Sequence, residues 1–103
     1  METQYLLHGK LIAKPEYKEE LADILIQASQ LVSTAKGCKL YAVSGDKDDA
    51  TSVYVTEIWD SKDDHDNSLK NEEVRALIIK AMPILGGQPT KGQELEILGG
   101  IGI

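Results

Sequence analysis

The hydrophobic positions of this chain change their spacing several times, and each change predicts a new element. Residues 4–13 and 93–99 alternate between apolar and polar side chains, which is the two-residue period of a strand. Residues 39–45 and 52–59 are rich in β-branched and aromatic side chains, and a polar, turn-prone segment separates them. That arrangement predicts an antiparallel hairpin, so four strands are expected in all.

Between the strands, apolar residues recur at steps of three and four, as in amphipathic helices. The first helix is predicted to begin at Pro15, with acidic residues in its first turn, and to end at Gly37. A short helix should follow the capping residue Ser61, and a longer one the capping residue Asn71, with Pro83 kinking or ending it. The first apolar stripe is Tyr17, Leu21, Ile24, Leu25, Ala28, Leu31 and Val32, and the last is Val74, Leu77, Ile78, Ala81 and Leu85.

The order of these elements predicts an α+β, ferredoxin-like β-α-β-β-α-β fold with the helices on one face of the sheet. The opposite face should then meet water, yet both faces of the third strand carry apolar side chains: Val53, Val55 and Trp59 on one, Tyr54 and Ile58 on the other. We therefore expect two copies of the chain to pack these sheets together as a homodimer.

Composition and charge limit the number of domains and the kinds of partner that the chain could have. The 103 residues suit a single domain, 1–103, with a core of about 4–98 and a short tail at 99–103. The net charge of −6 disfavours nucleic acid or an anionic membrane as a partner. Neither a signal peptide nor a long apolar run is evident, which predicts a cytoplasmic protein. The single cysteine, Cys38, excludes an internal disulfide and is expected to be a small buried residue at the start of a strand.

Two histidines could carry chemistry. His65 has four aspartates nearby in the sequence, which would favour its charged form; it is either a general acid or base or one residue of a solvated acidic helix. His8 shares a strand face with Leu6 and Ile12, so it either lines a pocket or lies at an interface. No second histidine or cysteine stands at ligand spacing, so no metal site is predicted.

Other polar residues could bind a substrate. Glu57 is a carboxylate on the otherwise apolar strand face of Trp59, and such a group needs a partner or has a raised pKa. Tyr41 and Tyr54 on neighbouring strands could donate hydrogen bonds to an oxygen of an aromatic ring, and so could Asn67 and Ser68 in the short-helix region. Trp59 is either an anchor of the core or interface, or a platform for a substrate. Phosphate-binding glycine loops and nucleophile elbows are absent from the sequence.

The segment 53–59, which ends in Glu57 and Trp59, the capped helix start at 61–66 and the junction at Gly37 together resemble the antibiotic biosynthesis monooxygenase family. The resemblance covers about residues 4–98. It implies a dimeric α/β barrel and the oxygenation of a quinol, phenol or polyketide-like aromatic by molecular oxygen, commonly without any cofactor. The protein would then supply a proton acceptor, His65 or His8, and orienting groups in a dry pocket.

The sequence departs from that family at one position. Many members have a histidine nine residues after the tryptophan, where this chain has Ser68, and His65 lies one helical turn earlier. Haem-degrading relatives have a tryptophan at the position of Ser68 and a haem-ligating histidine where this chain has Ile78, so haem degradation is disfavoured. The alternative is a non-catalytic dimer that binds a small molecule or serves as an interaction domain.

Overall fold

The computed structural model describes residues 4–87 and 92–103. Within them the chain forms four strands, three α-helices and a short 3-10 helix. In chain order they are β1 (Tyr5–Ile12), α1 (Lys18–Val32), β2 (Cys38–Gly45), β3 (Ser52–Trp59), α2 (Lys62–Ser68), α3 (Glu72–Ala81), the 3-10 helix η1 (Met82–Ile84) and β4 (Gln93–Glu96).

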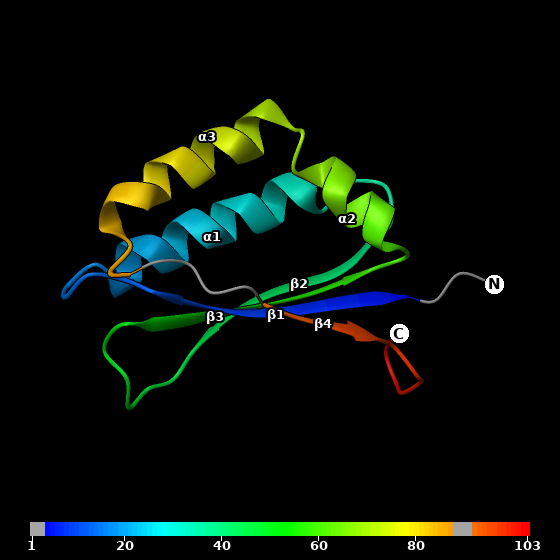
Figure 1. Ribbon diagram of the computed structural model, residues 1–103, viewed down its shortest axis with the longest axis horizontal. Helices are drawn as coiled ribbons and strands as arrows, with labels where there is room; N and C mark the ends of the chain where they lie inside the picture. Colours follow the sequence, from blue (N-terminus) through cyan, green and yellow to red (C-terminus); the bar gives the residue numbers. More distant parts are fainter. Residues whose placement is uncertain (1–3, 88–91) are drawn as a thin grey trace.

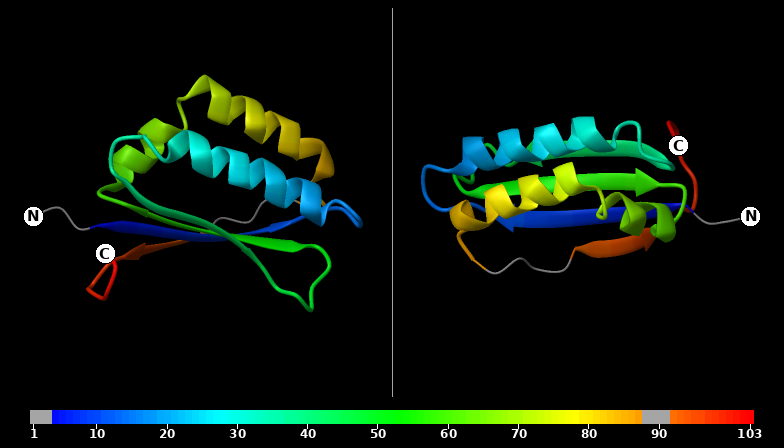
Figure 2. Two further views of the ribbon diagram at one scale, coloured as in Figure 1. Left: turned by 180° about the vertical axis from the view of Figure 1, so that it is seen from behind. Right: turned by 90° about the horizontal axis from the view of Figure 1, so that it is seen from above.

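The strands form one antiparallel sheet in the order β2-β3-β1-β4. All three helices lie over the same face of this sheet, and the other face carries no helix (Figure 1). Seen from above, α1 and α3 run side by side along the length of the strands, with α2 at one end (Figure 2). The predicted ferredoxin-like α+β fold is therefore confirmed, and it leaves one face of the sheet uncovered.

The first helix is shorter than predicted at both ends. Pro15 and Glu16 form a turn, in which Glu16 has a φ of 74°, and α1 begins only at Lys18. At the other end α1 stops at Val32, several residues before Gly37, although Gly37 does have the positive φ expected of it, 83°. That glycine is required, because a Cβ there would collide with the side chain of Asp64.

The predicted caps are present on the later helices. The Ser61 side chain accepts a hydrogen bond from the amide of Asp64 at the start of α2, and Asn71 caps α3 in the same way. Helix α3 gives way to η1 at Pro83, as the missing amide of proline predicts. Strand β4 ends at Glu96 instead of reaching residue 99. The glycine- and proline-rich segment 86–92 also predicts a turn before this strand, and of that segment residues 88–91 lie outside the described residues.

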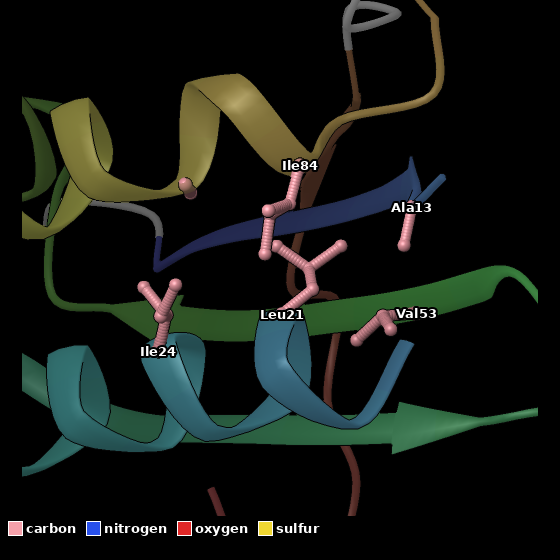
Figure 3. Packing of buried hydrophobic residues seen from close by; sticks show 6 residues of the cluster. Ala13, Leu21, Ile24, Val53 and Ile84 are labelled. Carbon is pink, nitrogen blue, oxygen red and sulfur yellow. The ribbon is translucent and has the colours of Figure 1, made fainter. Parts of the chain in front are cut away.

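Two apolar clusters hold the helices on the sheet. The larger one packs Leu21 and Ile24 of α1 against Val53 of β3, next to Ala13 and Ile84 (Figure 3). The second cluster comprises Tyr5, Val32, Trp59 and Val74. Cys38 only packs against the edge of this second cluster and is partly exposed, so its expected burial was wrong: it lies in an irregular stretch of β2, at the end of the sheet.

The strand register assigns each side chain to a face. Leu7, Tyr41 and Glu57 face the helices, whereas His8 and Thr56, which are register partners, face the uncovered side. The uncovered face is as apolar as the sequence predicts, with Ile12, Leu40 and Leu95 between 39% and 49% exposed. No helix within residues 4–87 and 92–103 is long and apolar enough to cross a membrane.

Candidate functional site

A cavity of about 520 Å³ lies between the helices and the sheet, bordered by side chains of both apolar clusters. Most of its wall is aliphatic and comes from the two helical stripes, including Leu25 of α1 and Leu77 and Ile78 of α3. The polar side chains among the described residues of its lining are Tyr41, Glu57 and Ser68. A cavity of this size and composition suits a small aromatic molecule with one or two polar groups.

Glu57 is the ionisable carboxylate in the described part of this lining. It stands near the end of β3, where strand alternation turns it toward the helices together with Val55 and Trp59, and it is only 9% exposed. The Trp59 indole Nε1–H donates a hydrogen bond to Glu57 Oε1 at 3.1 Å. Burial raises the pKa of Glu57, and the Trp59 hydrogen bond and nearby His65 oppose part of that rise. Glu57 is thus suited to exchange a proton.

Tyr41 is the register partner of Glu57 on β2, so the two side chains lie side by side on the helix-covered face. Both line the cavity. Burial, and then the charge of Glu57, raise the pKa of Tyr41, which keeps its phenol protonated. The cavity therefore contains a hydroxyl donor next to a proton acceptor.

His65 lies behind Glu57, at the base of α2. Its side chain is 11% exposed, and its ring packs against Tyr5 and, edge to face, against Trp59. The Nε2 atom is 3.9 Å from Glu57 Oε1, and the Nδ1 atom is 3.0 Å from Asp66 Oδ1. His65 does not line the cavity itself; it contacts a residue that does.

The other predicted site histidine, His8, is on the uncovered face. Its Nδ1 is 2.9 Å from Thr56 Oγ1, and its ring stacks on Tyr54 at a centroid distance of 5.9 Å. Lys10 Nζ also lies over the Tyr54 ring, 6.0 Å from its centroid. The sheet therefore separates His8 and Tyr54 from Glu57, Tyr41 and His65. His8 and His65 therefore do not meet in one cavity. The two tyrosines predicted for the site, Tyr41 and Tyr54, do not meet in one cavity either.

The remaining residues singled out in the sequence lie in or around the cavity. Trp59 is fully buried and holds the Glu57 carboxylate. Asn67 lines a smaller hollow between α2 and the end of α1, beside Lys36 and Asp64. Ser68, which the sequence predicts as a possible hydrogen-bond donor, lines the main cavity, and so does Ile78. Both positions at which related proteins have functional side chains thus face this cavity.

The described residues contain no cluster of three side chains of the types that bind metals. What the cavity does offer is a carboxylate with a raised pKa, a neutral phenol and a largely aliphatic wall. Fold and cavity together define a ferredoxin-like α+β protein with a largely apolar cavity that contains a buried carboxylate and a phenol.

The sequence profile described as antibiotic biosynthesis monooxygenase matches residues 5–78. The chain belongs to the antibiotic biosynthesis monooxygenase family, and the resemblance seen in the sequence is confirmed. No protein among curated sequences matches the chain.

Solved structures agree with this assignment. A proposed antibiotic biosynthesis monooxygenase from Chloroflexus aurantiacus J-10-fl is 31% identical, with a TM-score of 0.85, and the match covers 95% of this chain and 96% of that one. A second proposed member, from Caulobacter crescentus CB15, is 17% identical over 95% and 92% of the chains, with a TM-score of 0.86. A Bacteroides thetaiotaomicron protein of unknown function, described as a candidate oxidoreductase, is 10% identical over 94% and 100%, with a TM-score of 0.83. The last two show the shared fold alone.

Proposed function

We propose that this protein is a cofactor-independent monooxygenase that oxidises an electron-rich phenol or quinol with molecular oxygen. The observation that carries the proposal is the buried Glu57 carboxylate and its register partner Tyr41, which line one largely aliphatic cavity. Family membership supports the reaction class. The side chains in the cavity supply the role that such a reaction leaves to the protein, which is to deprotonate and orient the substrate.

In the proposed reaction Glu57 takes the proton from a substrate hydroxyl, and the Tyr41 hydroxyl donates a hydrogen bond to the resulting oxyanion. The electron-rich anion then reduces oxygen directly. Overall the substrate loses two hydrogen atoms and gains one oxygen atom, a four-electron oxidation. Oxygen accepts the four electrons: one of its atoms enters the product, and the other leaves as water with the two hydrogens.

The cavity wall contributes by excluding water. An anion in an aliphatic cavity interacts strongly with the few donors present, and reactive oxygen intermediates are protected from hydrolysis and stray protons. The sequence proposed His65 or His8 as the base. Glu57 now takes this role, because it lines the cavity and neither histidine does.

Oxygen uptake with a panel of hydroquinones and hydroxylated polycyclic aromatics tests this proposal. We expect turnover with one oxygen consumed per product, and with ¹⁸O₂ one labelled atom in the product. Ile78→Trp should abolish turnover by filling the cavity that Ile78 lines. Ile79→Trp is the matched control, because Ile79 is 67% exposed and is not among the cavity residues.

Tight binding of these aromatics without oxygen uptake above the uncatalysed rate would contradict the monooxygenase proposal. It would instead support a small-molecule-binding domain that uses the same cavity. Turnover that Ile78→Trp leaves unchanged would place the reaction elsewhere on the protein.

We also propose that the uncovered sheet face packs against the same face of a second copy. Ile12, Leu40 and Leu95 expose apolar surface there, and the register places no acidic side chain of the paired strands on this face, within the described residues. The acidic side chains of the paired strands therefore lie on the helix-covered face, outside the proposed contact.

Light scattering on the purified protein tests the dimer. The expected mass is twice the 11.3 kDa of one chain, and Leu40→Lys should shift it toward the monomer by burying a charge in the contact. Lys47→Glu is the control, because residue 47 lies in the exposed turn between β2 and β3. A wild-type mass of one chain at micromolar concentration would rule the dimer out.

A further inference from the structure

The side chain of His65 bridges the buried carboxylate of the cavity and a carboxylate at the surface. Its Nε2 faces Glu57 at 3.9 Å, and its Nδ1 contacts Asp66 at 3.0 Å. The Glu57 side chain is 12% exposed, whereas that of Asp66 is 48% exposed. Three consecutive groups therefore connect the cavity to solvent without passing through the cavity mouth.

The tautomer of His65 follows from these contacts. The hydrogen bond from His65 and the neighbouring Lys62 ammonium lower the pKa of Asp66, so this carboxylate is ionised and can only accept. Nδ1 must then carry the hydrogen that it donates to Asp66. In the neutral ring, Nε2 is left with a free lone pair on the side of Glu57, at 3.9 Å from Oε1. A protonated Glu57 must therefore move about 1 Å closer to reach the hydrogen-bond distance at which it can pass its proton to Nε2.

The remaining surroundings of the ring hold it in place without competing for the proton. Tyr5 of β1 packs on it at a centroid distance of 5.4 Å, and Trp59 of β3 meets it edge to face at 5.9 Å. Burial is the main cause of the raised pKa of Tyr5, so its phenol stays neutral. Glu57 and Asp66 are therefore the proton-exchanging partners of His65 among the described contacts.

We propose that His65 is a proton relay: it takes the substrate proton from Glu57 at Nε2, releases the Nδ1 proton to Asp66, and so moves one proton from the cavity to the surface. This inference rests on the proposed function, because it assumes that Glu57 receives a substrate proton. His65 itself touches no substrate.

The relay separates the proton from the substrate anion while the anion reacts with oxygen. A proton that stayed on Glu57 could return to the anion and stop its oxidation. When the second oxygen atom later leaves as water, a proton must come back, and its return along Asp66, His65 and Glu57 restores the starting tautomer. The relay is thus consistent with a reaction that releases no net proton.

A pH-jump experiment with bound 4-nitrophenol tests the relay without any turnover. This phenol absorbs visible light only as its anion, so a rapid drop in pH reports how fast a proton reaches the bound anion. His65→Gln is expected to slow this arrival about 100-fold, and Asp66→Asn about tenfold, by analogy with the usual contribution of a positioned acid or base. Free imidazole should restore part of the rate in His65→Ala.

Asp63→Asn is the matched control, because Asp63 is an exposed aspartate of the same helix and makes none of the described contacts with His65. Its rate should equal that of the wild type. A rate unchanged in His65→Gln would overturn the relay, since the proton would then enter by the cavity mouth. Equal slowing in Asp63→Asn would also overturn it, by showing that the effect is structural.

A second measurement separates the relay from the proposed function. Carboxyl ¹³C NMR should show the pKa values of both Glu57 and Asp66 higher in His65→Gln than in the wild type, because the imidazole lowers both. A rise in the pKa of Asp66 alone would show that His65 does not interact with Glu57, and this would overturn the relay. Failure of 4-nitrophenol to bind, with both pKa values rising, would instead contradict the proposed substrate class and leave the relay supported.

Discussion

The two faces of the sheet each carry one histidine, and the surroundings of the two rings differ. His65, over the helix-covered face, lies between two carboxylates and beside a cavity. His8, on the uncovered face, contacts a hydroxyl and a tyrosine ring and has no carboxylate among its described contacts. The comparison suggests a division of roles: the covered face supports proton chemistry, and the uncovered face supports assembly.

The largest expected effect concerns packing on the two faces. Trp59→Ala, on the covered face, removes a fully buried ring and should lower the free energy of unfolding by about 3–5 kcal/mol. Tyr54→Ala, five residues earlier in β3 and only partly buried, should cost clearly less. Urea denaturation at several protein concentrations measures both, and separates any contribution from association. Equal losses would mean that the two faces are packed alike.

Catalysis should distinguish the faces next. Glu57→Gln keeps the shape of the side chain and its contact with Trp59 but cannot accept the substrate proton, so kcat/KM should fall about 100-fold or more. His8→Gln should show no comparable loss, because His8 is on the other side of the sheet. Oxygen-uptake kinetics on both variants provide the comparison. A larger loss in His8→Gln than in Glu57→Gln would place the chemistry on the uncovered face and contradict the role proposed for Glu57.

The sequence predicted the division into faces but not the grouping of the site. Alternation along β3 correctly separated Glu57 and Trp59 from Tyr54, since a strand has a strict two-residue period. Alternation along one strand says nothing about which face of the neighbouring strand lies beside it. Tyr41 pairs with Glu57 because the register of β2 and β3 runs without interruption from the hairpin turn to Leu40. The turn sets that register, and no pattern within either strand reveals it.

The cavity also could not be predicted from the sequence. Its aliphatic residues appeared in the predicted helical stripes, where they could equally fill a core, and only the spacing of the helices over the sheet shows that they leave a space. The sequence placed both ends of α1 too far out. Pro15 and Gly37 are typical helix-boundary residues, but in this chain Pro15 lies in a turn before the helix and Gly37 in a turn after it.

The pH dependence of stability should depend on Glu57. Burial raises the folded-state pKa of this carboxyl, so as pH rises above about 4.3 the unfolded chain releases its proton first. The free energy of unfolding contributed by Glu57 is therefore greatest at low pH and falls as pH rises, until the folded carboxyl has ionised too. The slope for one proton cannot exceed about 1.4 kcal/mol per pH unit.

Denaturant titrations of the wild type and Glu57→Gln across this pH range isolate that contribution. The stability of the wild type relative to the variant should decline with rising pH. A relative stability that increased with pH would show that the folded protein favours the charged carboxylate, which would contradict its assignment as a group with a raised pKa.

The smallest expected effect compares the two tyrosines. Tyr41→Phe removes the hydroxyl that lies in the cavity beside Glu57, and the loss of one hydrogen bond, about 0.5–1.5 kcal/mol, should lower kcat/KM roughly two- to tenfold. If the hydroxyl stabilises the oxyanion formed during the reaction, the loss should fall on kcat more than on KM. Tyr54→Phe is the matched control, since Tyr54 stacks on His8 across the sheet. Steady-state kinetics in which both variants lost activity equally would show that the sheet does not separate catalysis from assembly.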